Sequence, residues 1–175
     1  MTSPRFSMSG VAKRFGGTQA LADVSLSVNA GEVHALIGEN GAGKSTFSKL
    51  LSGLLRHDAG VLMANRTILQ PHRRPSEHFA YHFQNPDLQL FSRTVIEEVR
   101  LSARRKDDEH VVNLLRTFGL DMLRHKHPMD LPFSLRKRLA IAVTIAMERP
   151  WIILDEPTIG QDDATIIAIA DIIKT

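Results

Sequence analysis

The residues with the clearest chemical meaning form one continuous loop, Gly38-Glu39-Asn40-Gly41-Ala42-Gly43-Lys44-Ser45-Thr46. The loop fits the pattern G-x-x-x-x-G-K-[ST] of a phosphate-binding segment, in which glycines let the backbone aim its N–H groups at a polyphosphate. Lys44 is predicted to reach the β- and γ-phosphates, and the Ser45 hydroxyl to ligate Mg²⁺. The competing interpretation is a glycine-rich turn that contains a lysine by chance.

Two adjacent carboxylates form a second candidate for chemistry. They follow the short apolar run Trp151-Ile152-Ile153-Leu154. This pattern predicts a buried strand that brings Asp155 and Glu156 to its carboxyl edge, where ligands bind in open α/β sheets. Asp155 would complete the Mg²⁺ shell, and Glu156 would orient or deprotonate an attacking water. The alternative is a helix cap or turn made of two acids.

The elements on either side of the loop must hold it in place. Residues Val33-His34-Ala35-Leu36-Ile37 are typical of a short buried strand. After the loop, apolar residues recur at the i, i+3, i+4 and i+7 positions of one helical face, at Phe47, Leu50, Leu51 and Leu54. The loop is therefore predicted to join a strand to a helix, whose N-terminus adds partial positive charge.

Alternating apolar residues predict antiparallel strands before and after this unit. The first segment has Phe6, Met8 and Val11, followed by Val24, Leu26 and Val28 before the turn Asn29-Ala30-Gly31. A second hairpin is predicted where residues 60–63 and 67–69 flank Asn65-Arg66. Phe15 is a lone aromatic in a loop, and ordinary packing is one explanation for it.

The second half of the chain reads as one strand followed by helices. A strand over residues 79–83 leads to Pro86, which cannot continue a hydrogen-bonded ladder. Thr94 and Glu97 have the spacing of a capping box, and Asp107-Asp108 precede an apolar helical pattern. Ser134 is predicted to cap a further helix, whose apolar face is Leu135, Leu139, Ala142 and Ala146.

Composition narrows the class of protein. The chain has 175 residues, 43% of them hydrophobic, which suits one domain with a real core. No apolar run approaches the roughly 18 residues of a membrane span, and residues 1–10 lack a signal-peptide core. We therefore expect a cytoplasmic protein. The net charge of +3 comes from scattered basic residues, so nucleic acid is not an expected partner.

With both motifs present, the chain resembles the nucleotide-binding domain of ATP-binding-cassette (ABC) proteins over essentially its whole length. The resemblance implies an α/β fold of the P-loop NTPase class, with an antiparallel β subdomain and a helical subdomain at about residues 86–148. Residues 1–175 would form a single domain. The cofactors implied are ATP and Mg²⁺.

The resemblance also implies roles that the residues alone do not. Phe15 lies where the aromatic that stacks on adenine would be. Gln84 looks like the glutamine that contacts Mg²⁺ and water while it senses the membrane partner, which places it with Lys44 and Glu156 in catalysis. Asp162 looks like the aspartate that crosses the dimer interface.

The resemblance leaves the transported substrate open. The stretch from Phe83 to Phe91 is similar to ATPases of the energy-coupling-factor group, which import vitamins, cobalt and nickel. The stretch from Phe15 through Ser45 looks more like ATPases of sugar importers.

Two segments depart from the family pattern. Where the family has Leu-Ser-Gly-Gly-Gln, which clasps the γ-phosphate bound to the opposite subunit, this chain has Leu131-Pro132-Phe133-Ser134-Leu135. Pro132 lacks a hydroxyl and an N–H, and Phe133 adds bulk, so a weakened clasp is expected. The chain then ends at Thr175, in an isoleucine-rich helix, where the family continues with further strands and a histidine. We therefore expect an incomplete domain, either a fragment or a decayed copy.

Three functions follow from this reading. The first is the ATPase subunit of an ABC transporter, which hydrolyses Mg-ATP between two such domains, identical or different, and drives a permease from the cytoplasmic face of the cell membrane. The second is a regulatory half that binds ATP without turnover. The third is a soluble ABC protein of DNA repair or translation, which would need tandem cassettes or a long coiled coil, and the sequence shows neither.

Overall fold

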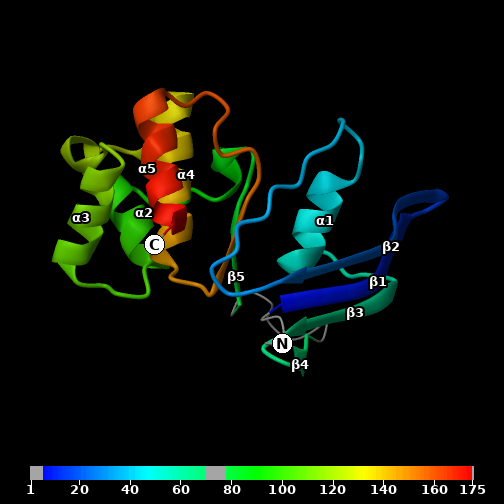
Figure 1. Ribbon diagram of the computed structural model, residues 1–175. Coiled ribbons are helices and arrows are strands. Elements are labelled where there is room, and N and C mark those ends of the chain that lie inside the picture. Colours follow the sequence, from blue (N-terminus) through cyan, green and yellow to red (C-terminus); the bar gives the residue numbers. More distant parts are fainter. Residues whose placement is uncertain (1–5, 70–77, 175) are drawn as a thin grey trace. The chain divides into compact units, whose positions relative to one another are not determined.

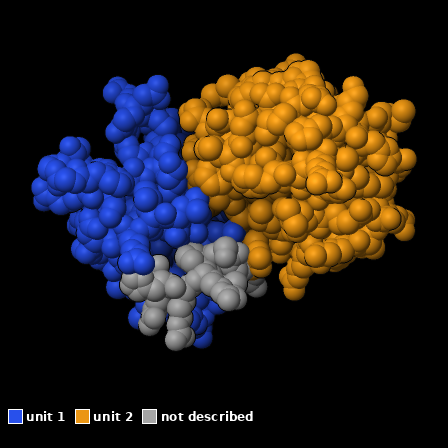
Figure 2. Space-filling model, turned by 180° about the vertical axis from the view of Figure 1, so that it is seen from behind, with its two compact units in different colours: residues 1–79 blue, residues 80–175 orange. Residues whose placement is uncertain are grey.

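The computed structural model of this chain describes residues 6–69 and 78–174. The chain divides into two compact units, Met1–Phe79 and Ala80–Thr175, which are blue and orange in Figure 2. Each unit has its own set of elements, and the two are described in turn. Among the described residues, no helix is long and apolar enough to cross a membrane.

Unit 1 is built on a four-stranded antiparallel sheet (Figure 1). Its strands are β1 (Phe6–Phe15), β2 (Thr18–Val28), β3 (Ala59–Ala64) and β4 (Thr67–Ile68), in the order β2-β1-β3-β4. Alternation of buried and exposed residues places Phe6 and Met8 in the core. The predicted antiparallel strands are therefore confirmed.

The hairpin between β3 and β4 also matches its prediction. Its two-residue turn is Asn65-Arg66, and Ala64 pairs with Thr67 across it. Both turn residues have positive φ, 48° and 66°, which is the backbone of a type I′ turn. This turn follows the right-handed twist of the strands, so it fixes their register locally.

One helix packs on the sheet of unit 1. Helix α1 (Lys44–Leu51) buries Phe47 and Leu50 and makes its contacts with β2. Leu54 lies beyond the end of the helix and is exposed, so the predicted apolar face is shorter than the spacing indicated.

The predicted strand at residues 33–37 is wrong. The structure assigns no strand from Glu32 to Asn40, and every residue of that range is exposed, Ile37 by 90%. An extended segment becomes a strand only through hydrogen bonds to a neighbouring strand. Both sheets of the described residues are built from other segments, so the apolar run has no ladder to join.

Unit 2 is mainly helical. Its α-helices are α2 (Val95–Ser102), α3 (Asp108–Thr117), α4 (Phe133–Ala146) and α5 (Asp163–Lys174). Short 3₁₀ turns connect them: η2 (Pro86–Leu88), η3 (Asp121–Leu123) and η4 (Pro128–Asp130). Helix α4 forms the centre, because Leu139 to Val143 are all buried and α2 and α3 both pack on it.

The helix starts test the capping predictions one by one. Thr94 caps α2 by accepting a hydrogen bond from the Glu97 N–H at 3.3 Å, and Asp107 caps α3 through the His110 N–H at 2.8 Å. The Ser134 prediction is wrong. Helix α4 begins one residue earlier, at Phe133, with Pro132 at the N-cap and no side-chain capping bond. A proline in this position still suits the start of a helix, because it has no N–H to leave unpaired.

Two short strands complete unit 2. Strand β5 (Phe79–His82) begins at the boundary with unit 1 and pairs with β6 (Trp151–Leu154). The Asp155 N–H donates to the His82 carbonyl at 3.2 Å, which joins the carboxyl ends of the two strands. The strand predicted before the two acids is therefore confirmed, but it is only partly buried, with Ile152 exposed.

Candidate functional site

The phosphate loop has the backbone that its glycines predict. Gly41 and Gly43 have φ values of 87° and 86°, a region that residues with side chains rarely adopt. A Cβ at Gly43 would also lie 2.7 Å from the carbonyl oxygen of Ala20 on β2. Only glycine therefore fits where the loop turns into α1. The Ala42 N–H donates to the Glu39 carbonyl at 3.1 Å and closes the turn.

Lys44 folds back over this loop. Its Nζ donates to the carbonyl oxygens of Gly38 and Glu39 at 2.6 and 2.8 Å. The ammonium group therefore lies beside the backbone that would surround a phosphate. These weak neutral acceptors do not neutralise its charge, which stays available to an anionic ligand.

The N-terminus of α1 provides the other half of the cradle. Its first N–H groups have no partners within the helix, the N-cap Gly43 makes no side-chain bond, and the first turn contains no acidic residue. Phosphate oxygens are the groups that such an end attracts. Ser45 is exposed and Thr46 half-buried, so the Ser45 hydroxyl is accessible to a ligand or its metal.

The two acids at the end of β6 have separate partners in unit 2. Asp155 Oδ2 accepts a hydrogen bond from the Tyr81 hydroxyl at 2.9 Å. Burial, reinforced by this bond to the carboxylate, raises the pKa of Tyr81, so the hydroxyl stays protonated and keeps donating. One oxygen of Asp155 is thereby fixed, while its second oxygen stays available for a ligand.

Glu156 is held at both its side chain and its backbone. Gln84 Nε2, from the segment after β5, donates to Glu156 Oε2 at 2.5 Å, although the two residues are 72 positions apart. Lys137 Nζ donates to the Glu156 carbonyl oxygen at 2.5 Å. The structure therefore brings together three of the predicted residues: Gln84, Asp155 and Glu156.

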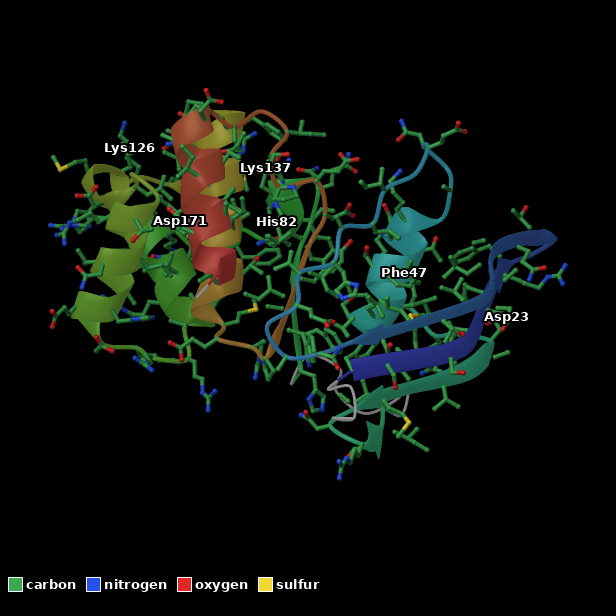
Figure 3. All side chains as sticks on the ribbon, viewed as in Figure 1. Asp23, Phe47, His82, Lys126, Lys137 and Asp171 are labelled. Atoms are coloured by element: carbon green, nitrogen blue, oxygen red, sulfur yellow. The ribbon has the colours of Figure 1, made fainter. Side chains whose placement is uncertain are left out.

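Two buried polar residues beside the acids were not predicted as part of the site. Lys137 on α4 is 1% exposed and His82 on β5 is 0% exposed; both are labelled in Figure 3. Burial, with a contribution from the Lys137 charge, lowers the pKa of His82 to about 4. Lys137 shares its helical face with Ala140, Ile141 and Thr144, at i+3, i+4 and i+7, which are all buried.

Phe15, predicted to stack on adenine, lies at the end of β1 in unit 1. Its ring is 48% exposed, so packing in the core does not account for it. Lys13 Nζ lies 5.4 Å from the ring centroid, which leaves an amphipathic surface of one ring and one cation. An exposed aromatic face of this kind is suited to stacking.

Asp162, predicted to cross a dimer interface, has partners within its own unit. Its Oδ1 accepts from the Thr165 N–H and hydroxyl at the start of α5, and its Oδ2 accepts from Arg138 at 2.5 Å. The bonds from Thr165, and then the Arg138 contact, lower the pKa of this carboxyl group. Asp162 therefore fixes the beginning of α5.

The altered segment 131–135 shows where its two unusual residues lie. Phe133 is the first residue of α4 and is 47% exposed, with the Arg136 guanidinium 5.8 Å from its ring centroid. Arg136 also donates to Asp87 Oδ1 at 2.8 Å. The start of α4 is thus covered by an aromatic ring and an ion-paired arginine, which differs from the glycine backbone of the family pattern.

The residues present fit a nucleotide with its metal. The loop offers N–H groups, an ammonium group and a hydroxyl, which are the partners of phosphate. Ser45 in unit 1 and Asp155 in unit 2 each offer an oxygen ligand of the kind that Mg²⁺ prefers. The described residues contain no group of three or more acidic, histidine or cysteine side chains that could hold a metal alone.

Comparison with known proteins agrees with these features. The family model described as ABC transporter matches residues 21–159. A putative ABC transporter ATP-binding protein of Methanosarcina mazei is 34% identical over 170 residues, covering 93% of this chain and 29% of the relative. An energy-coupling factor transporter ATP-binding protein of Clostridium perfringens is 37% identical over 156 residues, covering 83% and 55%. The chain thus spans between about a third and a half of these relatives.

Solved structures with the same fold include one from C. perfringens. CbiO1, described as part of the ABC transporter complex CbiONQ, has a TM-score of 0.80 and 29% identity, covering 99% of this chain and 73% of that one. An ATP-binding subunit of an ABC transporter has a TM-score of 0.82 at 28% identity, covering 97% and 73%. With the phosphate loop and the acid pair in place, this chain belongs to the ABC transporter ATP-binding family.

Proposed function

We propose that this chain is an ATP-binding subunit of an ABC transporter that binds and hydrolyses Mg-ATP. One observation carries the proposal furthest: Glu156 is held by Gln84 beside Asp155, at the shared carboxyl ends of β5 and β6. A site that only binds nucleotide has no need of a second, oriented carboxylate. The names of the relatives, which are ATP-binding proteins of transporters, support the same function.

Each residue has a distinct part in the proposed reaction. The N–H groups of the loop and Lys44 hold the phosphates and offset their charge. Glu156 accepts a proton from the attacking water, and Gln84 orients that water by its bond to Glu156. Ser45, Gln84 and Asp155 would hold Mg²⁺, which would supply positive charge to offset that of the phosphates.

The cradle and Phe15 together define the proposed nucleotide site. Gly38, Asn40, Gly41, Ala42, Gly43 and Thr46 form its backbone with Lys44 and Ser45. Phe15 stacks on the base, because its ring is exposed and carries a cation nearby. We propose residues 1–175 as one nucleotide-binding domain, with a helical subdomain at about 86–148.

We further propose two kinds of partner. One is a second ATPase domain, identical or different, and the other is an integral membrane permease. Relatives described as parts of transporter complexes support both, and a dimeric relative of the same fold, with a TM-score of 0.81 at 22% identity, supports the first. The protein would then lie on the cytoplasmic face of the membrane through its permease.

The test is turnover of the complete gene product, purified with its partner subunits and checked by intact mass. We expect Glu156→Gln to lower the rate of ATP hydrolysis about 100-fold or more while ATP still binds, because only the base is lost. Lys44→Ala should weaken ATP binding itself. Glu109→Gln, at an exposed carboxylate on α3, is the matched control. Binding without hydrolysis in the unmodified protein would contradict the proposed ATPase and leave an ATP-binding regulatory half.

A further inference from the structure

The ammonium group of Lys137 lies in an unusual place for a lysine. The residue is 1% exposed, and its Nζ donates to the backbone carbonyl of Glu156, 19 positions along the chain. Lysine is almost never fully buried unless its charge has a partner. Here the partner is the backbone of the very residue proposed as the catalytic base.

The backbone of Glu156 needs such support. Its φ is 51°, in the left-handed region that non-glycine residues seldom adopt. This conformation persists only where surrounding contacts impose it. Since the direction of the Cα–Cβ bond of Glu156 follows from its backbone angles, a contact to the carbonyl oxygen helps to fix where the side chain starts, and the bond from Gln84 then holds the carboxylate.

Lys137 is the central member of a row on α4. Ser134, Lys137 and Arg138 lie at i, i+3 and i+4, on one face of the helix. Each contacts the segment that follows β6: the Ser134 carbonyl accepts from Gln161 at 3.2 Å, and Arg138 pairs with Asp162 at 2.5 Å. The first turns of α4 thus bind the segment 156–162 at three points, of which Lys137 is the buried one.

The charges around Lys137 help to stabilise its ammonium group in the interior. Burial lowers the pKa of its ammonium group, while Glu156 and Asp155 oppose that change. His82 is the other titratable group in contact with it electrostatically, and it is neutral at physiological pH because its own pKa is lowered to about 4. The charged groups that act on the Lys137 ammonium group are therefore the carboxylates of Asp155 and Glu156.

We propose that Lys137 is a positioning residue for ATP hydrolysis, which holds the Glu156 carboxylate in its working orientation through the bond from Nζ to the Glu156 backbone carbonyl. The proposal rests on the proposed function, because it takes Glu156 as the base. It assigns to α4 a part in the reaction that involves no contact with nucleotide.

The first experiment compares Lys137→Met with the unmodified protein in its complete complex. Methionine keeps much of the volume but removes the charge and the donor. We expect kcat to fall about 10- to 100-fold, since small misplacements of a catalytic group have effects of this size. The KM for ATP should change less than about twofold, because the phosphate loop is untouched. The melting temperature should fall moderately, because the variant leaves the Glu156 carbonyl without its donor and the two nearby carboxylates without their cation.

The second experiment measures hydrogen exchange without nucleotide, so it does not depend on turnover. Lys137→Met should raise deuterium uptake across residues 155–162 and leave α4 unchanged. Lys126→Met removes an exposed lysine of the same unit (Figure 3) and should alter neither uptake nor kcat. If Lys137→Met fails to fold, Lys137→Gln, which keeps a shorter, uncharged donor, takes its place, and its effects on kcat and uptake should have the same direction and be smaller.

Unchanged kcat and unchanged uptake at 155–162 would overturn the proposal for Lys137. Faster exchange throughout α4, with uptake at 155–162 raised no more than in α4, would also overturn it, by showing that Lys137 only stabilises the helix. If the unmodified protein hydrolyses no ATP, the proposed function fails by itself. The exchange measurement then still decides whether Lys137 holds Glu156.

Discussion

His82 shows at the residue scale how a single buried group makes stability depend on pH. Its ring lies at the carboxyl end of β5, 0% exposed, and neither ring nitrogen has a hydrogen-bond partner among the described residues. A charged imidazole in this place would be desolvated and repelled by Lys137. Burial, the larger cause, and that repulsion together lower the pKa of His82 to about 4.

The unfolding free energy should therefore fall as pH is lowered from about 6.5 to about 4. In this window the unfolded state binds a proton on His82 and the folded state does not, so acid favours unfolding. Above pH 6.5 the imidazole is neutral in both states and the effect vanishes. A difference of 2.5 pKa units corresponds to roughly 3 kcal/mol at most. Urea unfolding at a series of pH values measures the slope.

His82→Leu is the control for this prediction. It removes the titration while it keeps the site filled, so the slope between pH 6.5 and 5 should become flatter than in the unmodified protein. Glu32 does not affect this comparison. Hydrogen bonds from Asn29 lower its pKa from 4.5 to about 2, so its contribution to the unfolding free energy changes with pH only below the range of pH 6.5 to 5. Equal slopes in the two proteins would show that His82 is not the titrating group.

The site residues that were predicted are those with local signatures. Lys44 and Ser45 follow from glycine spacing, and Asp155 and Glu156 from an apolar run that ends in acids. Lys137 and His82 could not be assigned in this way, since each gains its meaning from a contact far along the chain. The sequence places Lys137 in a basic run, which resembles a solvated face.

At the scale of elements, two helix starts in unit 2 differ in whether the residue predicted to cap them does so. Asp107 accepts the His110 N–H at 2.8 Å at the start of α3. Ser134 lies inside the first turn of α4, where its side chain makes no capping bond. Both residues are good cap formers by type, so only the position of the helix start distinguishes them.

Replacing each residue by alanine should show this difference. We expect Asp107→Ala to lower the unfolding free energy by about 1 kcal/mol, because an N–H at the start of α3 loses its acceptor. Ser134→Ala should change it by less than about 0.5 kcal/mol, since alanine suits a helix interior. Chemical denaturation of both variants measures the pair. A loss at Ser134 as large as that at Asp107 would mean that α4 begins later in solution than in the structure.

Elements were predictable where their determinants are local. The hairpin turn Asn65-Arg66 and the caps at Thr94 and Asp107 depend on neighbours a few residues away, and all three are confirmed. The run 33–37 has the composition of a strand, but pairing needs a partner elsewhere in the chain, and the structure provides none among the described residues. Strand β6 does pair with β5, but it was predicted to be buried and is only partly so.

At the scale of the whole molecule, the proposed chemistry is divided between two compact units. The phosphate loop and Phe15 belong to unit 1, and Gln84, Asp155 and Glu156 belong to unit 2. Each group has a complete local geometry within its own unit. The proposed function assigns both groups to nucleotide binding, so the binding free energy would stabilise both units.

Hydrogen exchange over the whole chain tests this coupling. Without nucleotide, residues 32–42 should exchange fast, because they are exposed and outside any strand, while β1 and α4 should be strongly protected. Saturating Mg-ATP should slow exchange at residues 38–46, which are proposed to bind the phosphates, and also at 155–157, which are proposed to hold the metal and the attacking water. Lys44→Ala should abolish both changes together. Protection confined to the loop would show that nucleotide binds unit 1 alone, and protection of residues 33–37 without nucleotide would restore the strand that the sequence predicts there.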